Sequence, residues 1–149
     1  MLQMHHEIGN MLESPDFTEV TTTADIRKQR HGNRAKCLQR LVRLGLPVPQ
    51  TVALSFETVR DIANGQIPDL TSLLGVFDTD PLLISVRSSS EGADWGGPGT
   101  ILNIGMNDAT HAVLSDRLGR ERADKLYLRF IRSFAIEVMR LDDAPFLDA

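Results

Sequence analysis

The chain of 149 residues has few of the residue types that build several common kinds of site. Its one cysteine, Cys37, excludes an intramolecular disulfide and a cysteine metal cluster, and it favours a reducing compartment. No apolar run approaches the length of a membrane span, and the N-terminus lacks the basic start and apolar middle of a signal peptide. Neither a Walker-type phosphate loop nor the pattern GxGxxG is present. We therefore expect a cytoplasmic protein without a membrane partner.

The length and the overall composition of the chain are those of one globular domain. Hydrophobic residues make up 42% and charged residues 24%, and the length allows a real core. The net charge of −4 argues against general nucleic-acid binding. His5 and His6 are adjacent and would point apart on a helix, so we assign no metal ligand. We expect a single domain, with residues 1–16 as a flexible lead, 17–142 as the folded part and 143–149 as a tail.

The most informative stretch runs from Pro81 to Asp108. Pro81–Val86 is a short apolar run that predicts a buried strand, and Thr100–Ile104 predicts a second one. Between them lie Arg87, the serines Ser88–Ser90 and a glycine-rich loop. A cation, hydroxyls and glycine backbone at the end of a strand suit an anionic, phosphate-like ligand. A glycine-rich hairpin loop between two core strands is the alternative, and spacing leaves both open.

A basic segment precedes this stretch. Seven of the 16 basic residues fall between positions 27 and 43 with no acidic residue among them: Arg27, Lys28, Arg30, Arg34, Lys36, Arg40 and Arg43. Gly32-Asn33 predicts a helix start and Gly45 its end, which puts Arg34 in the first turn. A cation there is unfavourable unless an anion binds. A solvated basic face and an RNA-binding patch are the alternatives, but the segment has no aromatic residues to stack on bases.

The remaining pattern predicts an α+β fold, a small mixed sheet packed with several helices. Phe17–Thr23 is expected as an edge strand and Thr51–Leu54 as another strand. Three helices are expected to begin at the capping side chains of Ser55, Asp69 and Asn107. A long amphipathic helix is expected from about Glu121 to Leu141, with a core stripe of Leu126, Phe130, Phe134, Val138 and Leu141.

Three motifs in order resemble the N-terminal nucleotide-binding region of pyruvate, phosphate dikinase. Leu83–Ser88 with Thr100–Asp108 is similar to the family pattern VSVRSGA…TILNLGLND. Gly32–Leu38 followed by Arg43–Pro49 is similar to GGKGANL…RLGLPVP. The segment that begins at Tyr127 is similar to the YRRFI…VM helix, so the resemblance covers roughly residues 31–141.

The resemblance implies the N-terminal lobe of an ATP-grasp domain. Such an enzyme forms phosphoenolpyruvate from pyruvate, ATP and phosphate through a phosphohistidine on a separate domain. By motif position, Arg87 corresponds to the catalytic arginine that contacts the nucleotide phosphates, and Arg34 stands where the family has a phosphate-contacting lysine. Ser88 and Gly96 are the further residues assigned to ATP binding. Mg²⁺ is the implied metal, with its ligands expected outside this chain.

The chain also departs from the family pattern. Asn33 and Ala35 replace glycines, and Gly99 stands in place of an acidic residue. Trp95 would either stack on a ligand or anchor its loop, and the serines followed by Glu91 are also similar to phosphoenolpyruvate synthases. We expect a part of a longer enzyme that is inactive alone and contacts the parent enzyme's other domains; a homodimer stays open. A stand-alone, non-catalytic nucleotide-binding or regulatory module is the alternative.

Overall fold

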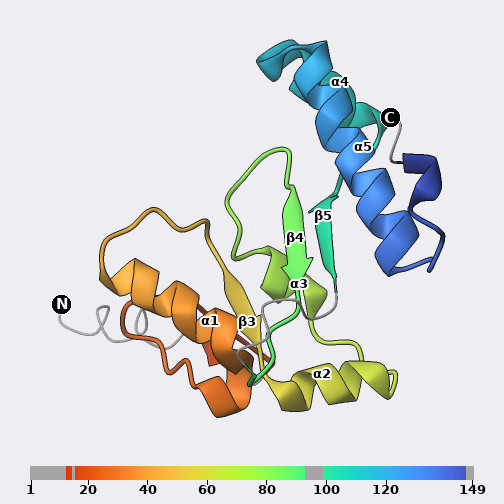
Figure 1. Cartoon of the computed structure of the whole chain (residues 1–149). Coiled ribbons are helices and arrows are strands. Elements are labelled where there is room, and N and C mark those ends of the chain that lie inside the picture. Colours follow the sequence, from red (N-terminus) through yellow and green to blue (C-terminus); the bar gives the residue numbers. More distant parts are fainter. Residues whose placement is uncertain (1–12, 15, 93–98, 147–149) are drawn as a thin grey trace. The chain divides into compact units, whose positions relative to one another are not determined.

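A computed structural model describes residues 13–14, 16–92 and 99–146, which fall into two compact units (Figure 1). The first unit holds the described residues up to Phe77 and also the segment that starts at Ser89. The second unit holds Asp78–Ser88 and the described residues from position 99 onward. The single lobe expected over residues 17–142 stays a prediction.

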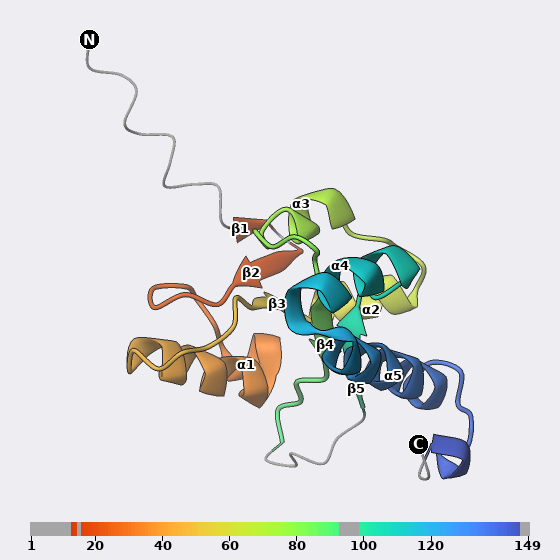
Figure 2. The ribbon, with the colours of Figure 1, turned by 90° about the horizontal axis from the view of Figure 1, so that it is seen from above.

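The first unit contains a three-stranded antiparallel sheet with the order β1-β2-β3, and Figure 2 shows the three strands side by side. The strands are β1 (Glu13–Ser14), β2 (Phe17–Glu19) and β3 (Val52–Leu54). Phe17 pairs with Leu54 across β2 and β3, and Ser14 pairs with Phe17 across β1 and β2. The expected edge position of Phe17–Thr23 is therefore wrong, because β1 occupies the edge and lies inside the stretch expected as a lead.

Three helices complete the first unit: α1 (Lys28–Arg43), α2 (Phe56–Ala63) and α3 (Leu70–Leu74). Helix α1 packs against β3 and α2 (Figure 1). The capping predictions for α2 and α3 are confirmed. The Ser55 hydroxyl accepts a hydrogen bond from the Thr58 amide at 3.0 Å, and the Asp69 carboxylate accepts one from the Thr71 amide at 3.0 Å.

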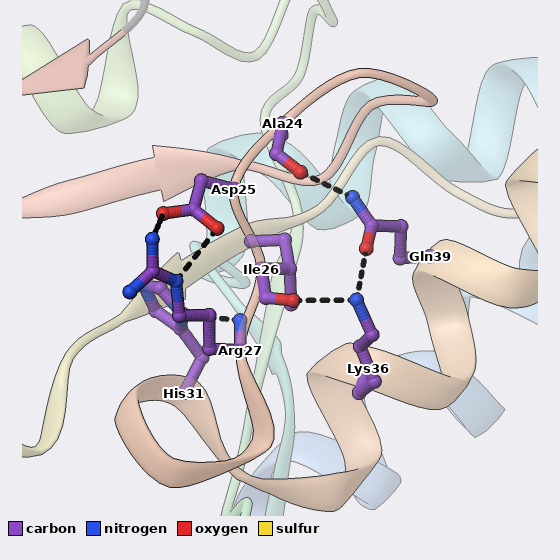
Figure 3. A network of polar contacts seen from close by, with 7 residues as sticks. All are labelled: Ala24, Asp25, Ile26, Arg27, His31, Lys36 and Gln39. Carbon is purple, nitrogen blue, oxygen red and sulfur yellow. Dashed lines mark hydrogen bonds and ion pairs between the residues drawn. The ribbon is translucent and has the colours of Figure 1, made fainter.

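A buried polar network fastens the chain before α1 to the helix itself (Figure 3). Gln39 is fully buried, and its Nε2 donates to the carbonyl oxygens of Thr21 at 3.1 Å and Ala24 at 2.6 Å. Lys36 Nζ donates to the Ile26 carbonyl at 2.7 Å and to Gln39 Oε1 at 3.0 Å. Ile26 itself is 1% exposed in the apolar core of this unit. Because buried polar groups are costly unless they are paired, these bonds fix the entry of the chain into α1.

The second unit is a β-hairpin packed on two helices. Strands β4 (Ile84–Arg87) and β5 (Thr100–Ile104) are antiparallel, and they are followed by α4 (Asp108–Leu118), α5 (Arg120–Glu137) and a 3₁₀ turn at Ala144–Phe146. Asn107 caps α4 as expected, through a bond from the Thr110 amide at 2.9 Å. The core gathers Met106, Leu114 and Ala123, with Leu83, Leu126, Tyr127 and Phe130 packed against them.

Two hydrogen bonds join β5 to α5 within the second unit. Asn103 Nδ2 donates to the Leu126 carbonyl at 3.0 Å, and the Leu102 amide donates to Ser133 Oγ at 3.0 Å. The strand therefore runs against the helix, as Figure 1 also shows. This packing fixes the start of β5, where the glycine-rich stretch ends, against α5.

Three expectations for this architecture are wrong. The described residues form two small antiparallel sheets, where one mixed sheet was expected, because strand pairing depends on long-range contacts that periodicity does not encode. Strand β4 was expected to be buried, but Val86 is 52% exposed. Helix α5 ends at Glu137, and Phe134, Val138 and Leu141 are exposed. An apolar stripe marks a face able to be buried, and burial needs a partner element that the described part of this unit does not supply.

Candidate functional site

The candidate site begins at a break inside α1. Gly32 has φ of 82° and ψ of 171°, which is not helical, so the helix restarts at Asn33. Helix α1 starts at Lys28, one turn earlier than expected, but the break still gives Arg34 and Ala35 first-turn positions in the restarted helix. The amides of such a first turn have no partner within the helix and are open to acceptors from elsewhere.

The turn before the break is held by His31, which is 2% exposed. The Arg27 amide donates to His31 Nδ1 at 3.2 Å, and the His31 amide donates to the Arg27 carbonyl at 2.7 Å (Figure 3). Arg27 also pairs with Asp25 at 2.7 Å. Burial, and then the nearby charge of Arg30, lowers the pKa of His31. The imidazole is therefore held neutral, with Nδ1 as the acceptor.

His31 is expected to make the first unit less stable as the pH falls. In the folded chain its pKa is lowered, whereas unfolded histidine titrates near 6.5. Below the unfolded value the unfolded chain binds more protons, so the stability from neutral His31 is complete above about pH 6.5 and is lost on acidification. Urea denaturation at about pH 7.5 and about pH 5.5 should show a smaller pH effect for His31→Gln than for wild type. An equal pH effect in both proteins would contradict the assignment.

Two serines from far along the chain cap the N-terminus of the restarted helix in the first unit. The Asn33 amide donates to the Ser90 carbonyl at 2.7 Å, and the Ala35 amide donates to Ser89 Oγ at 3.2 Å. We call Ser89–Ser90 the serine segment. A side chain at position 32 would overlap the Ser89 carbonyl and hydroxyl, so the approach requires glycine there. Sequence reasoning identified the serine run as a source of donors but missed this contact, which no local signal reveals.

The residues predicted to bind phosphate fall in both units. Arg34 is half-buried in the first unit and Arg87 is exposed at the end of β4 in the second. Within the described ranges, neither guanidinium has an ion pair or a hydrogen bond to another side chain. Ser88 is half-buried, and Gly96 lies outside the described residues, as does Trp95. Each free cation is compatible with an anionic ligand, and a cradle shared by the two arginines stays a prediction.

No family model matches the chain. The chain is 33% identical to pyruvate, phosphate dikinase of Entamoeba histolytica, over 78% of this chain and 15% of that enzyme. It is 32% identical to the dikinases of Clostridium symbiosum and Rhizobium meliloti, over 77% and 80% of this chain and 15% of each enzyme. The chain is similar to one segment of pyruvate, phosphate dikinase. The resemblance predicted from three motifs is confirmed for a segment that spans about 15% of the length of these dikinases.

The chain also carries a carboxylate close to a position where the family pattern has an acidic residue. Gly99 stands at that position, and a side chain built there would overlap the carboxyl group of Glu137 from α5. Glu137 is half-buried, and both residues belong to the second unit. A carboxyl group from another element therefore lies against position 99, which the sequence did not signal.

Part of the basic segment has structural partners. Arg27 pairs with Asp25, Lys36 binds the Ile26 carbonyl, and Arg43 Nε donates to the Thr22 carbonyl at 2.8 Å. These three cations hold the chain before α1 in place.

In the part of the chain that the structure describes, no group of three or more acidic, histidine or cysteine side chains is placed to hold a metal ion. None of the described helices is long and apolar enough to cross a membrane.

Proposed function

We propose that this chain is the N-terminal lobe of an ATP-grasp nucleotide-binding domain in an enzyme of the pyruvate, phosphate dikinase type. That enzyme, here called the parent dikinase, would form phosphoenolpyruvate from pyruvate, ATP and phosphate through a phosphohistidine on another domain. The observation that carries the proposal is the similarity to dikinases over about four fifths of this chain. A cytoplasmic location, Mg²⁺ bound by residues outside this chain and contact with the parent's other domains belong to the same proposal.

In this function the two arginines would bind the phosphates of ATP. Arg34 would act beside the first turn of the restarted helix, where the helix dipole also favours negative charge. Arg87 would offset the charge that develops on the transferred group, which is the main task of cations in phosphoryl transfer. Both side chains keep their donors unengaged among the described residues, which supports these roles.

Replacing Arg34 tests the proposal in the chain itself. We expect weak MgATP binding, poorer than micromolar, and Arg34→Ala should weaken it about tenfold through loss of charge-assisted hydrogen bonds. Arg34→Lys should be milder if only charge matters, since lysine keeps the charge but not the planar fork. Arg40→Ala is the matched control, because Arg40 is exposed on the same helix. Titrations followed by calorimetry and by amide NMR shifts provide the measurement; equal losses for Arg34→Ala and Arg40→Ala would refute the role of Arg34.

A stand-alone, non-catalytic nucleotide-binding or regulatory module is the second candidate. It is favoured by Asn33 and Ala35 at positions where the family pattern has glycine, and by internal hydrogen bonds from both of their amides. The related phosphoenolpyruvate synthase activity is a further form of the first candidate. The codons that follow Ala149 distinguish the two classes: continued coding sequence supports a lobe of a parent enzyme, and a stop codon supports the module.

A further inference from the structure

The hydrogen bonds of the serine segment bear on how the proposed phosphate site is controlled. A helix start is normally closed by the side chain of its own capping residue, but the residue in that place here is Gly32, which has none. Ser89 Oγ and the Ser90 carbonyl close the helix from a part of the chain more than 50 positions away. The cap is thus supplied by a segment that is not part of α1.

The bonded amides are donors that a phosphate would use. An anion at a helix start is bound by the amides of the first turn, and here those of Asn33 and Ala35 are already engaged. One amide cannot donate a full hydrogen bond to both a serine oxygen and a phosphate oxygen. Occupation by the serine segment and occupation by phosphate at these two amides are therefore mutually exclusive.

We propose that the serine segment is an autoinhibitory latch on the restarted helix of α1, and that the phosphates of a nucleotide displace it. This inference rests on the proposed function, because it concerns regulation of the same site. The latch bonds have a neutral hydroxyl and a carbonyl as acceptors, whereas bonds to an ionised phosphate are about twice as strong. A triphosphate that also meets the Arg34 charge can replace the segment, and an isolated weak anion cannot.

The latch is tested by removing only the Ser89 hydroxyl. Ser89→Ala frees the Ala35 amide and leaves the Ser90 carbonyl bond in place. The affinity of the chain for inorganic tripolyphosphate and for MgATP should rise about fivefold, the effect of one ordinary hydrogen bond. Hydrogen exchange of the Ala35 amide should become faster in the absence of ligand. Ser90→Ala is the matched control, because Ser90 contributes its backbone carbonyl and should bind like wild type.

A second variant is expected to change the affinity for both probes in the opposite direction. Ser89→Asp keeps a capping acceptor and adds a negative charge that a helix start stabilises, so it should strengthen the latch and lower the affinity for both probes. If Ser89→Ala lowers the affinity, or leaves it unchanged, the latch is overturned. Binding that depends on Arg34 but does not respond to Ser89→Ala overturns the latch alone. If no variant binds either probe, both the latch and the proposed function fail.

Discussion

Replacing Arg87 with alanine in the parent dikinase is expected to lower the rate of phosphoryl transfer from ATP by about two to three orders of magnitude, the usual cost of one transition-state donor. Arg87 ends β4 with its side chain exposed and has no side-chain partner among the described residues, so its removal disturbs little packing. The effect should appear in single-turnover rates of ATP cleavage and in phosphoenolpyruvate formation. Because the lost interaction strengthens in the transition state, the maximal rate should fall more than the affinity for ATP.

The matched control for Arg87 is Arg122 in the same unit. Arg122 is exposed on α5 and lies outside the motifs of the dikinase resemblance, so Arg122→Ala should retain nearly full activity. Thermal denaturation of the Arg87→Ala protein should match that of wild type, which separates lost chemistry from lost fold. Near-normal phosphoryl transfer in Arg87→Ala would show that the assignment of Arg87 is wrong.

Replacing Gly32 with alanine is expected to destabilise the first unit by about 3 kcal/mol, the combined cost of a positive φ and of a forced overlap. The backbone at Gly32 has φ of 82°, and the added methyl group would meet the Ser89 carbonyl and hydroxyl. Ser89 has to move away, so the hydrogen bonds that cap the Asn33 and Ala35 amides are lost as well. Urea denaturation measures the change in the free energy of unfolding.

Two other glycines of the first unit separate backbone strain from the overlap. Gly45 and Gly65 also have positive φ, of 71° and 89°, but nothing lies within 4 Å of an added methyl group at either position. Gly45→Ala and Gly65→Ala should therefore cost about 1 kcal/mol each, from the backbone alone. If Gly32→Ala costs no more than these two variants, the close approach of Ser89 contributes nothing to stability.

Features that depend on neighbouring residues could be predicted from the sequence. Ser55, Asp69 and Asn107 cap their helices as expected, because a capping side chain bonds to an amide two or three residues further on. The hairpin strand Thr100–Ile104 was also predicted correctly, since its apolar run and its glycine-rich approach are local signals. The dikinase resemblance is of the same kind, because it depends on short motifs in a fixed order.

Features that depend on contacts across the chain emerged only with the tertiary structure. The central position of β2, the two separate sheets and the exposed end of the α5 stripe all depend on which element packs on which. The same holds for the Gln39 network and for the approach of Ser89 to Gly32. The sequence by itself determined where α2, α3 and α4 begin, through the side chains that cap them. Only folding decided that a distant serine occupies the helix start beside Arg34, because a hydrogen bond between residues over 50 positions apart leaves no periodic signal in the chain.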